Sequence, residues 1–394
     1  MRLPTRLDRY PAKMVSHLAE SLISRYAADA TRILDPFSGS GAILLAAHNQ
    51  TIPATGIDVN PLAGLFAKVK IFGFDPLRAR ELAIRLFESA RRRNRRERVN
   101  WDAKGYWFNP KTLAAYEYIR GAARDFDLLG SNDGIAILLS IALSIRPCSK
   151  ADQRSPKPFI SKEAAVSRGQ RQFDPYTTSL TILTDLGRLY GTPKIDDGFS
   201  FLNHDITSKV ELRTLVGEHS HVITSPPYAN AQDYFRNFKL ELHLLEGVLP
   251  FSVAAIRERF IGTERGDLLD GVSEEHLETA RSSVRGLRQL ERSDIRKSAI
   301  IHRYFYDMAH AFDACIACIR PGGVFVLVCG DNLVGGLRIR TWKVLSEMLE
   351  VRGLRMFDRF SDKICDRLLP PRRSGHKGLI KEEVVSAFRL SGST

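Results

Sequence analysis

The sequence of 394 residues has few cysteines and no long apolar run. The five cysteines are odd in number and scattered, which favours reduced thiols over a disulfide framework. No segment reaches the roughly 18 uninterrupted apolar residues that a membrane span needs. The arginine-rich start lacks the apolar core of a secretory signal. We therefore expect a cytoplasmic protein without a membrane segment.

A metal-binding cysteine pattern is also lacking. Cys315 and Cys318 are spaced as Cys-x-x-Cys, but they lie in the apolar stretch Ala314–Ile319 with no second Cys or His pair nearby. Zinc sites normally supply four such ligands. The pattern predicts a buried helix face and no metal site.

The sequence also has fewer acidic than basic residues. The chain has 58 Lys and Arg against 45 Asp and Glu, a formal net charge of +13. Basic side chains gain affinity for nucleic acids because they displace counterions from phosphates. The charge balance favours a polyanionic partner.

What the sequence does contain begins with a strand–turn–helix–strand pattern near the N-terminus. Helical spacing covers residues 15–28, and the short apolar run Ile33–Leu34 follows it. A glycine-rich turn then leads into the apolar helix 42–47, and a second strand at 54–57 ends in Asp58. This is a βαβ unit with an acid at the tip of its second strand.

Later segments predict an α/β core split by two helical insertions. Strand patterns return at 221–224, 324–328 and 384–390, whereas the intervening stretches have amphipathic helical spacing. We expect a doubly wound, Rossmann-like α/β core. The predicted division is 1–75 for the cofactor-binding half, 76–200 for a helical insertion, 201–235 for the catalytic loop, 236–304 for a second helical insertion, and 305–394 for the rest of the core.

The first candidate site is the turn between the first strand and its helix. Glycines let the backbone approach a ligand, and the following helix presents free N–H groups. An acid at the second strand tip, Asp58, can accept the hydroxyls of a ribose. The turn residues are Asp35, Pro36, Phe37, Ser38, Gly39, Ser40 and Gly41.

The second candidate site is Ser225-Pro226-Pro227-Tyr228, which ends the strand at 221–224 because prolines cannot continue it. An exocyclic amine of a base is a poor nucleophile, since its lone pair is delocalised into the ring. The Ser225 side chain and the Pro226 carbonyl can accept hydrogen bonds from that amine and orient its nitrogen. Tyr228 can stack on a base rotated out of the duplex.

Together these motifs resemble the amino-methylating DNA methyltransferases, specifically their Ser-Pro-Pro-Tyr subgroup. The similarity covers roughly residues 9–70, 203–247 and 305–330, and includes the upstream Tyr10-Pro11-Ala12-Lys13. The resemblance implies that Asp35–Gly41 wrap the methionine part of S-adenosylmethionine, that Asp58 binds its ribose, and that Asp205 lies beside its adenine amine. It also implies methyl transfer to cytosine N4 in double-stranded DNA.

One departure concerns the order of the motifs, since many cytosine-N4 enzymes place the catalytic loop first. Here the cofactor motif comes first, so the domain looks circularly permuted relative to those enzymes. Both motifs still end neighbouring strands, whichever is translated first. Ser225, in place of Asp or Asn, is then the residue that separates cytosine N4 from adenine N6.

Recognition of DNA is expected from the insertions. The tract Arg91–Arg98 is a candidate for phosphate contact. Side chains able to read base edges follow it. They are Gln153, Arg154, Lys157, Arg168, Gln170 and Arg171. A restriction-modification system with a separate cognate endonuclease is the expected context.

Other functions stay open beside this one. The alternatives are an adenine-N6 DNA methyltransferase, an RNA guanine-N2 methyltransferase, and a DNA-binding protein on an inactive methyltransferase scaffold. Pro147-Cys148 is similar to the nucleophile of cytosine carbon-5 methyltransferases, but such an enzyme has no use for Ser225-Pro226-Pro227-Tyr228, and Cys148 fits the buried end of an apolar helix.

Overall fold

The computed structural model describes residues 10, 14–152, 157–160, 173–192, 198–208, 212–229, 234–264, 266–363 and 382–391. These residues divide into two compact units. The sheet unit takes its residues from Ala12–Val59, Gly198–Asp233 and Glu258–Thr394. The helical unit takes its residues from Met1–Pro11, Asn60–Asp197 and Tyr234–Arg257.

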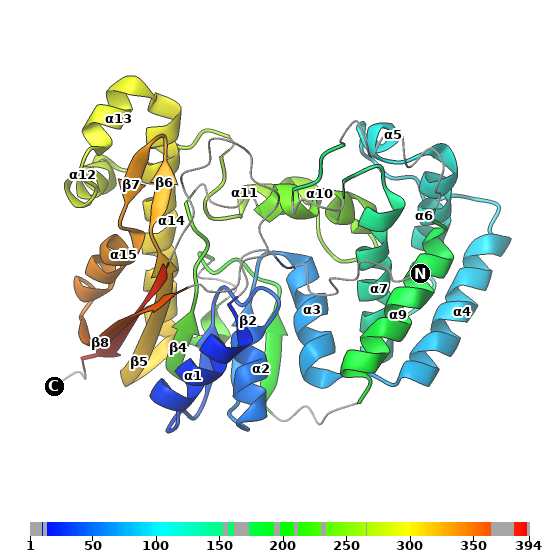
Figure 1. The fold of residues 1–394 in the computed structure, drawn as a ribbon, viewed down its shortest axis with the longest axis horizontal. Coiled ribbons are helices and arrows are strands. Elements are labelled where there is room, and N and C mark those ends of the chain that lie inside the picture. Colours follow the sequence, from blue (N-terminus) through cyan, green and yellow to red (C-terminus); the bar gives the residue numbers. More distant parts are fainter. Residues whose placement is uncertain are drawn as a thin grey trace. The chain divides into compact units, whose positions relative to one another are not determined.

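The sheet unit is built on a mixed sheet of seven strands in the order β3-β2-β1-β4-β5-β9-β8 (Figure 1). All neighbours from β3 to β5 are parallel, and β9 runs antiparallel between β5 and β8. The strands are β1 (Ile33–Asp35), β2 (Ala54–Ile57), β3 (Phe199–Leu202), β4 (His219–Thr224), β5 (Ile319–Gly330), β8 (Leu354–Lys363) and β9 (Glu382–Leu390). The predicted α/β fold class, with a Rossmann-like core, is confirmed.

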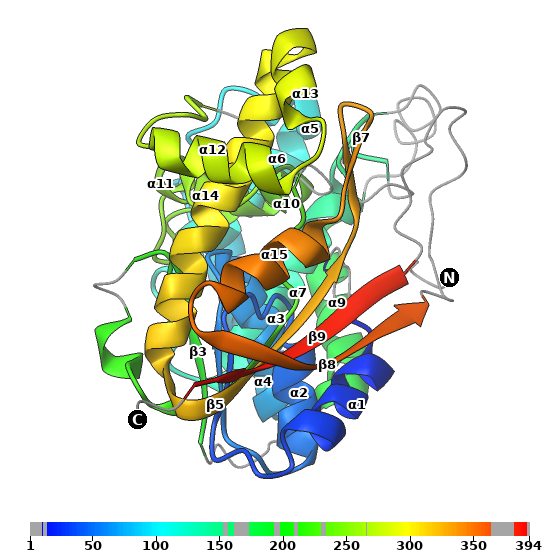
Figure 2. The same cartoon turned by 90° about the vertical axis from the view of Figure 1, so that its left-hand side faces the viewer.

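Helices cover this sheet. Helices α1 (Ser16–Tyr26) and α2 (Ala42–Asn49) pack together beside β1 and β2. Helices α14 (Ile295–Cys318) and α15 (Thr341–Glu350) pack against β5, and Figure 2 shows α14 and α1 on opposite sides of β5. The unit also contains a hairpin, β6 (Asn332–Val334) with β7 (Leu337–Ile339), the helices α12 (Glu274–Ser283) and α13 (Leu287–Ser293), and the 3-10 turn Arg213–Leu215.

The core of the sheet unit explains why its central strands read as continuous apolar runs. Leu34, Val222, Phe325 and Phe388 are fully buried and belong to one cluster with residues of α14. Parallel strands covered on both faces favour such runs. Cys315 and Cys318 lie in this cluster on α14, so the predicted buried helix face is confirmed.

The helices of the helical unit come from two separate stretches of chain, 60–197 and 234–257. The first supplies α3 (Pro61–Phe72), α4 (Pro76–Arg92), α5 (Lys104–Trp107), α6 (Pro110–Ala123), α7 (Asn132–Cys148) and α9 (Pro175–Tyr190). The second supplies α10 (Tyr234–Leu245), and α11 (Val253–Glu258) ends at its boundary. Three arginines of the first stretch donate to backbone carbonyls of the second. The pairs are Arg120 with Leu244, Arg124 with Gly247, and Arg146 with Asn237.

The predicted division and the compact units differ at three places. Tyr10, which falls in the predicted cofactor-binding half 1–75, belongs to the helical unit. Helix α3 belongs to the helical unit, which therefore takes up the chain at Asn60. Helices α12 to α14 belong to the sheet unit. Helix α14 packs on β5, and α12 and α13 pack on α14. None of the helices in the described part of the chain combines the length and hydropathy that a membrane crossing requires.

Gly73 lies where the end of α3 packs closely against the backbone of Thr192. It follows α3 with φ +63°, and a Cβ at this position would lie 2.1 Å from the Thr192 carbonyl oxygen. We expect Gly73→Ala to lower the free energy of unfolding by about 3 kcal/mol, because it adds a backbone clash to an unfavourable φ. Urea denaturation of the whole chain measures this. Gly217→Ala is the control: its φ is +70° but a Cβ meets nothing within 4 Å, so an equal loss would show that the clash is unimportant.

Candidate active site

Both predicted motifs lie where the strand order of the sheet reverses. Chain connections leave β1 toward β2 on one side, while β4 lies on the other side of β1. Open α/β sheets bind ligands outside the carboxyl ends of the strands at such a switch point. Asp35 ends β1 and Thr224 ends β4. The Thr224 hydroxyl donates to Asp35 Oδ1 at 2.7 Å, so the strand ends that carry the two motifs are in direct contact.

The turn after β1 has the backbone geometry that its glycines predict. Gly39 and Gly41 have φ of 49° and 80°, which side chains disfavour. Gly41 is the N-cap residue of α2, and no side chain at this position accepts a hydrogen bond from the first N–H groups of the helix. The Ser38 hydroxyl donates to the Ile57 carbonyl and ties the turn to β2. Pro36 and Ser40 are buried, and Phe37 packs on the core.

Asp58 is held against this same turn. Its Oδ2 accepts the Gly39 N–H at 2.9 Å, and its backbone carbonyl accepts the Asn203 side chain at 2.6 Å. The carboxylate at the tip of β2 therefore lies at the glycine-rich turn. This is the position from which an acid can reach ribose hydroxyls in a Rossmann-like fold.

Asp35 has unusual electrostatics for a carboxyl group. Its side chain is 4% exposed. Burial raises the pKa of Asp35 to about 7, although hydrogen bonds from Thr224 and the Phe37 N–H oppose the rise and Asp58 adds to it. A buried carboxyl that ionises near neutrality favours a cationic ligand, because a positive charge would stabilise its ionised form.

The segment 225–229 after β4 is anchored on both sides. Thr224 fixes its start, and the Asn332 side chain donates to the Ala229 carbonyl at 2.9 Å. Between them the Tyr228 hydroxyl donates to Glu383 Oε1 at 2.8 Å. Ser225 and Pro227 are half-buried within this span. The loop therefore presents the Ser225 side chain and the Pro226 carbonyl from a fixed backbone, which is what orientation of a substrate requires.

Tyr228 lies in the core of the sheet unit in this structure. Its side chain is 6% exposed. Burial, followed by the neighbouring Glu383 carboxylate, holds the pKa of its hydroxyl well above the usual range, so the hydroxyl stays protonated and donates. Stacking of this ring on a base stays a prediction, whereas its present contact anchors the loop.

Asp205 and Tyr10 form none of the hydrogen bonds described above for the turn after β1 and the loop after β4. Asp205 follows β3, and its Oδ1 accepts hydrogen bonds from the Thr207 N–H and hydroxyl, which close a local turn. Tyr10 belongs to the helical unit and packs edge-on against Phe66. Its companions Pro11, Ala12 and Lys13 lie outside the described residues, and so do Gln153, Arg154, Arg168, Gln170 and Arg171.

Four residues of the site were not assigned a role from sequence. Thr224 ended the predicted strand 221–224 without one, and Asn203, Asn332 and Glu383 lay outside both motifs. Only their position at strand ends gave a signal. Within the described residues, no group of three or more His, Cys, Asp or Glu side chains is placed to hold a metal ion.

Comparison with known proteins gives three similar sequences. The chain is 27% identical over 382 residues to the Type II methyltransferase M.AvaI of Nostoc sp., an alignment that covers 88% of this chain and 78% of that protein. The chain is similar to Type II methyltransferases. The M.AvaI protein of Anabaena variabilis matches equally well. The Type II methyltransferase M.MvaI of Kocuria varians is 19% identical over 400 residues, covering 94% of this chain and 86% of that protein.

No protein-family model matches the chain. The chain is similar to these Type II methyltransferases over most of its length, and the names of the relatives specify no base. Because the alignments span most of both chains, they include the helical unit as well as the sheet unit.

Proposed function

We propose that the chain is a DNA methyltransferase of a restriction-modification system, which transfers a methyl group from S-adenosylmethionine to cytosine N4. The observation that carries this proposal is the hydrogen bond from Thr224 to Asp35, which joins the glycine-rich turn to the Ser225-Pro226-Pro227-Tyr228 loop at the switch point. The named relatives support the methyltransferase class and the restriction-modification context.

The residues of the turn fit the cofactor. S-adenosylmethionine, when bound, supplies an electrophilic methyl group on a sulfonium. The positive-φ glycines Gly39 and Gly41 and the uncapped start of α2 leave backbone for a close approach. Asp58 offers a carboxylate for the ribose, and Asp35 offers a buried carboxyl suited to a positive charge.

Substrate orientation falls to the loop after β4. The Ser225 hydroxyl and the Pro226 carbonyl are acceptors for the two hydrogens of an exocyclic amine. With both hydrogens held, the lone pair of the amine nitrogen is directed out of conjugation with the ring. Anchoring by Thr224, Tyr228 and Asn332 keeps these acceptors in place, so orientation is prepared before the substrate arrives.

The direct test is incubation of the purified protein with tritiated S-adenosylmethionine and either genomic DNA or total RNA. Nucleoside digestion and mass spectrometry then identify the product. We expect N4-methylcytosine from DNA. N6-methyladenine would correct the base, label in RNA alone would favour the guanine-N2 alternative, and no label would favour an inactive scaffold.

Asp58 provides a test of the cofactor site. We expect Asp58→Ala to weaken S-adenosylmethionine binding by about 10-fold or more, because it removes both the ribose acceptor and the acceptor of the Gly39 N–H. Isothermal titration calorimetry measures the dissociation constant. Glu350→Ala, which removes an exposed acid at the end of α15, is the control, and an unchanged dissociation constant in Asp58→Ala would contradict the assignment.

A further inference from the structure

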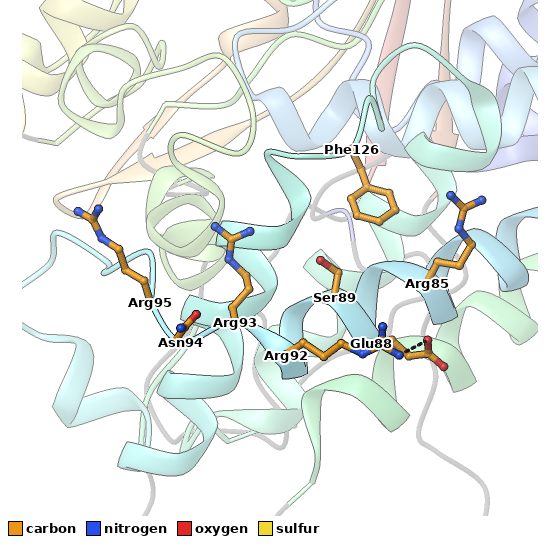
Figure 3. A pocket seen from close by; sticks show the side chains of 8 residues that line it. All are labelled: Arg85, Glu88, Ser89, Arg92, Arg93, Asn94, Arg95 and Phe126. Atoms are coloured by element: carbon orange, nitrogen blue, oxygen red, sulfur yellow. Dashed lines mark hydrogen bonds and ion pairs between the residues drawn. The ribbon is translucent and has the colours of Figure 1, made fainter.

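The helical unit has a cavity of about 570 Å³ beside the C-terminal half of α4. Its lining is rich in arginine and contains a single acid. The lining residues are Arg85, Glu88, Ser89, Arg92, Arg93, Asn94, Arg95 and Phe126 (Figure 3). This cavity lies wholly within the helical unit and includes no residue of the candidate active site.

Two of these arginines have partners. Arg92 pairs with Glu88 at 3.4 Å, but their side chains are 80% and 52% exposed, so the pair holds Arg92 weakly. Arg93 donates to Asp125, and a Cβ on Gly121 would lie 2.9 Å from Arg93 Nε. Because Gly121 has no side chain, the Arg93 guanidinium can pack against its backbone at the wall of the cavity.

Arg85 and Arg95 differ from them. Among the described residues, neither forms a salt bridge or a hydrogen bond, and both are exposed. Figure 3 shows Arg85 on one side of Phe126, with Arg93 and Arg95 on the other. The positive groups therefore lie spread along the cavity instead of converging on a single point.

This spacing fits an extended polyanion. Arg85 and Arg92 are seven residues apart on α4, so they share one face and are separated by about 10 Å along its axis. That rise is close to the axial advance of three phosphates on one DNA strand, at about 3.4 Å each. Ser89 and Asn94 add donors for phosphate oxygens, and the Phe126 ring adds an apolar surface for a sugar.

We propose that this cavity binds the sugar–phosphate backbone of duplex DNA. The inference rests on the proposed function and deepens it, since it assigns a DNA contact to the helical unit. Guanidinium groups recognise phosphate by paired hydrogen bonds, and such contacts fix the position of the duplex without reading its sequence. The cavity is therefore a positioning contact, and base recognition belongs elsewhere on the protein.

The test is the double variant Arg85→Ala/Arg95→Ala in the whole chain. Both side chains are exposed and unpaired among the described residues, so the variant should fold normally. The probe is a fluorescent duplex of random sequence, with binding followed by anisotropy over a range of salt concentrations. We expect the dissociation constant to rise about 10-fold and the slope of log K against log salt to become shallower by about 1.8, since two phosphate contacts are lost.

Two further variants isolate the effect. Arg78→Ala/Arg80→Ala removes the same charge from the same helix outside the cavity, and we expect less than about a twofold change. Arg85→Lys/Arg95→Lys should restore the salt slope, because it keeps both charges. An unchanged slope in the alanine variant or an equal loss in the Arg78/Arg80 control would each overturn the proposal.

This binding assay is separate from the proposed activity. It needs no methyl transfer, so a chain that fails to methylate DNA can still show the predicted salt dependence. If methylation proceeds but the Arg85/Arg95 variant binds and methylates as the wild type does, the cavity is not a DNA contact and the proposed function stands.

Discussion

Replacing Ser225 by alanine should lower the rate of methyl transfer by a factor on the order of 10², with cofactor affinity unchanged. The Ser225 hydroxyl is the side-chain acceptor that the fixed loop offers to the target amine, and its loss leaves the Pro226 carbonyl alone to orient the nitrogen. The residue lies outside the glycine-rich turn, so binding of S-adenosylmethionine should not change. Single-turnover kinetics with saturating DNA measure the chemical step.

The matched control is Ser282→Ala, which removes an exposed hydroxyl that bonds only locally on α12. We expect this variant to have the wild-type rate. A wild-type rate in Ser225→Ala would refute the catalytic assignment. A rate loss accompanied by an equal loss of cofactor affinity would instead indicate that the loop has a structural role in the cofactor site.

Asp35→Asn should remove a pH dependence of cofactor binding that is centred near pH 7. The carboxyl is buried, with a pKa of about 7, and is therefore only partly ionised at neutral pH. A cationic ligand favours the ionised form, so wild-type affinity should rise as the pH increases through 7. Asparagine cannot ionise, so we expect a flat profile and a loss of about 10-fold or more in affinity at pH 8. Calorimetric titrations between pH 5.5 and 8.5 measure this.

The same variant has a second readout in stability. Between pH 4 and 7 the unfolded chain ionises Asp35 while the folded chain keeps it protonated, so the free energy of unfolding should fall as the pH rises across this range. A difference of about three pKa units corresponds to an upper bound of about 4 kcal/mol. Asp35→Asn should lack this decline, and its asparagine oxygen can still accept the Thr224 hydroxyl. Identical pH profiles for the two proteins would contradict the raised pKa.

Local patterns predicted the parts of the site that lie within one motif. The apolar run at Ile33–Leu34, the glycines after it and the helix at 42–47 predicted β1, its turn and α2, because each signal acts over neighbouring residues. The prolines after Thr224 likewise predicted the end of β4. These signals need no knowledge of distant contacts.

Edge strands and contacts between distant residues could not be predicted from such local sequence patterns. β8 is rich in charged residues, as strands at a sheet edge often are, and β3 has only four half-buried residues. Tyr228 and Glu383 are 155 positions apart, and only the placement of β9 beside β5 brings them together. The second helical insertion was predicted at 236–304, and the fold packs its helices α12 and α13 with the sheet unit.

The helices of the helical unit come from two stretches of chain, and this constrains how the unit can be exchanged between relatives. Because Arg120, Arg124 and Arg146 of the first stretch donate to carbonyls of the second, neither stretch is a self-contained cassette. A chimera that takes residues 60–197 from a relative, but keeps its own 234–257, would present foreign arginines to unmatched carbonyls. A transplantable module must therefore contain both stretches together, although the loop Ser225-Pro226-Pro227-Tyr228 lies between them in the sequence.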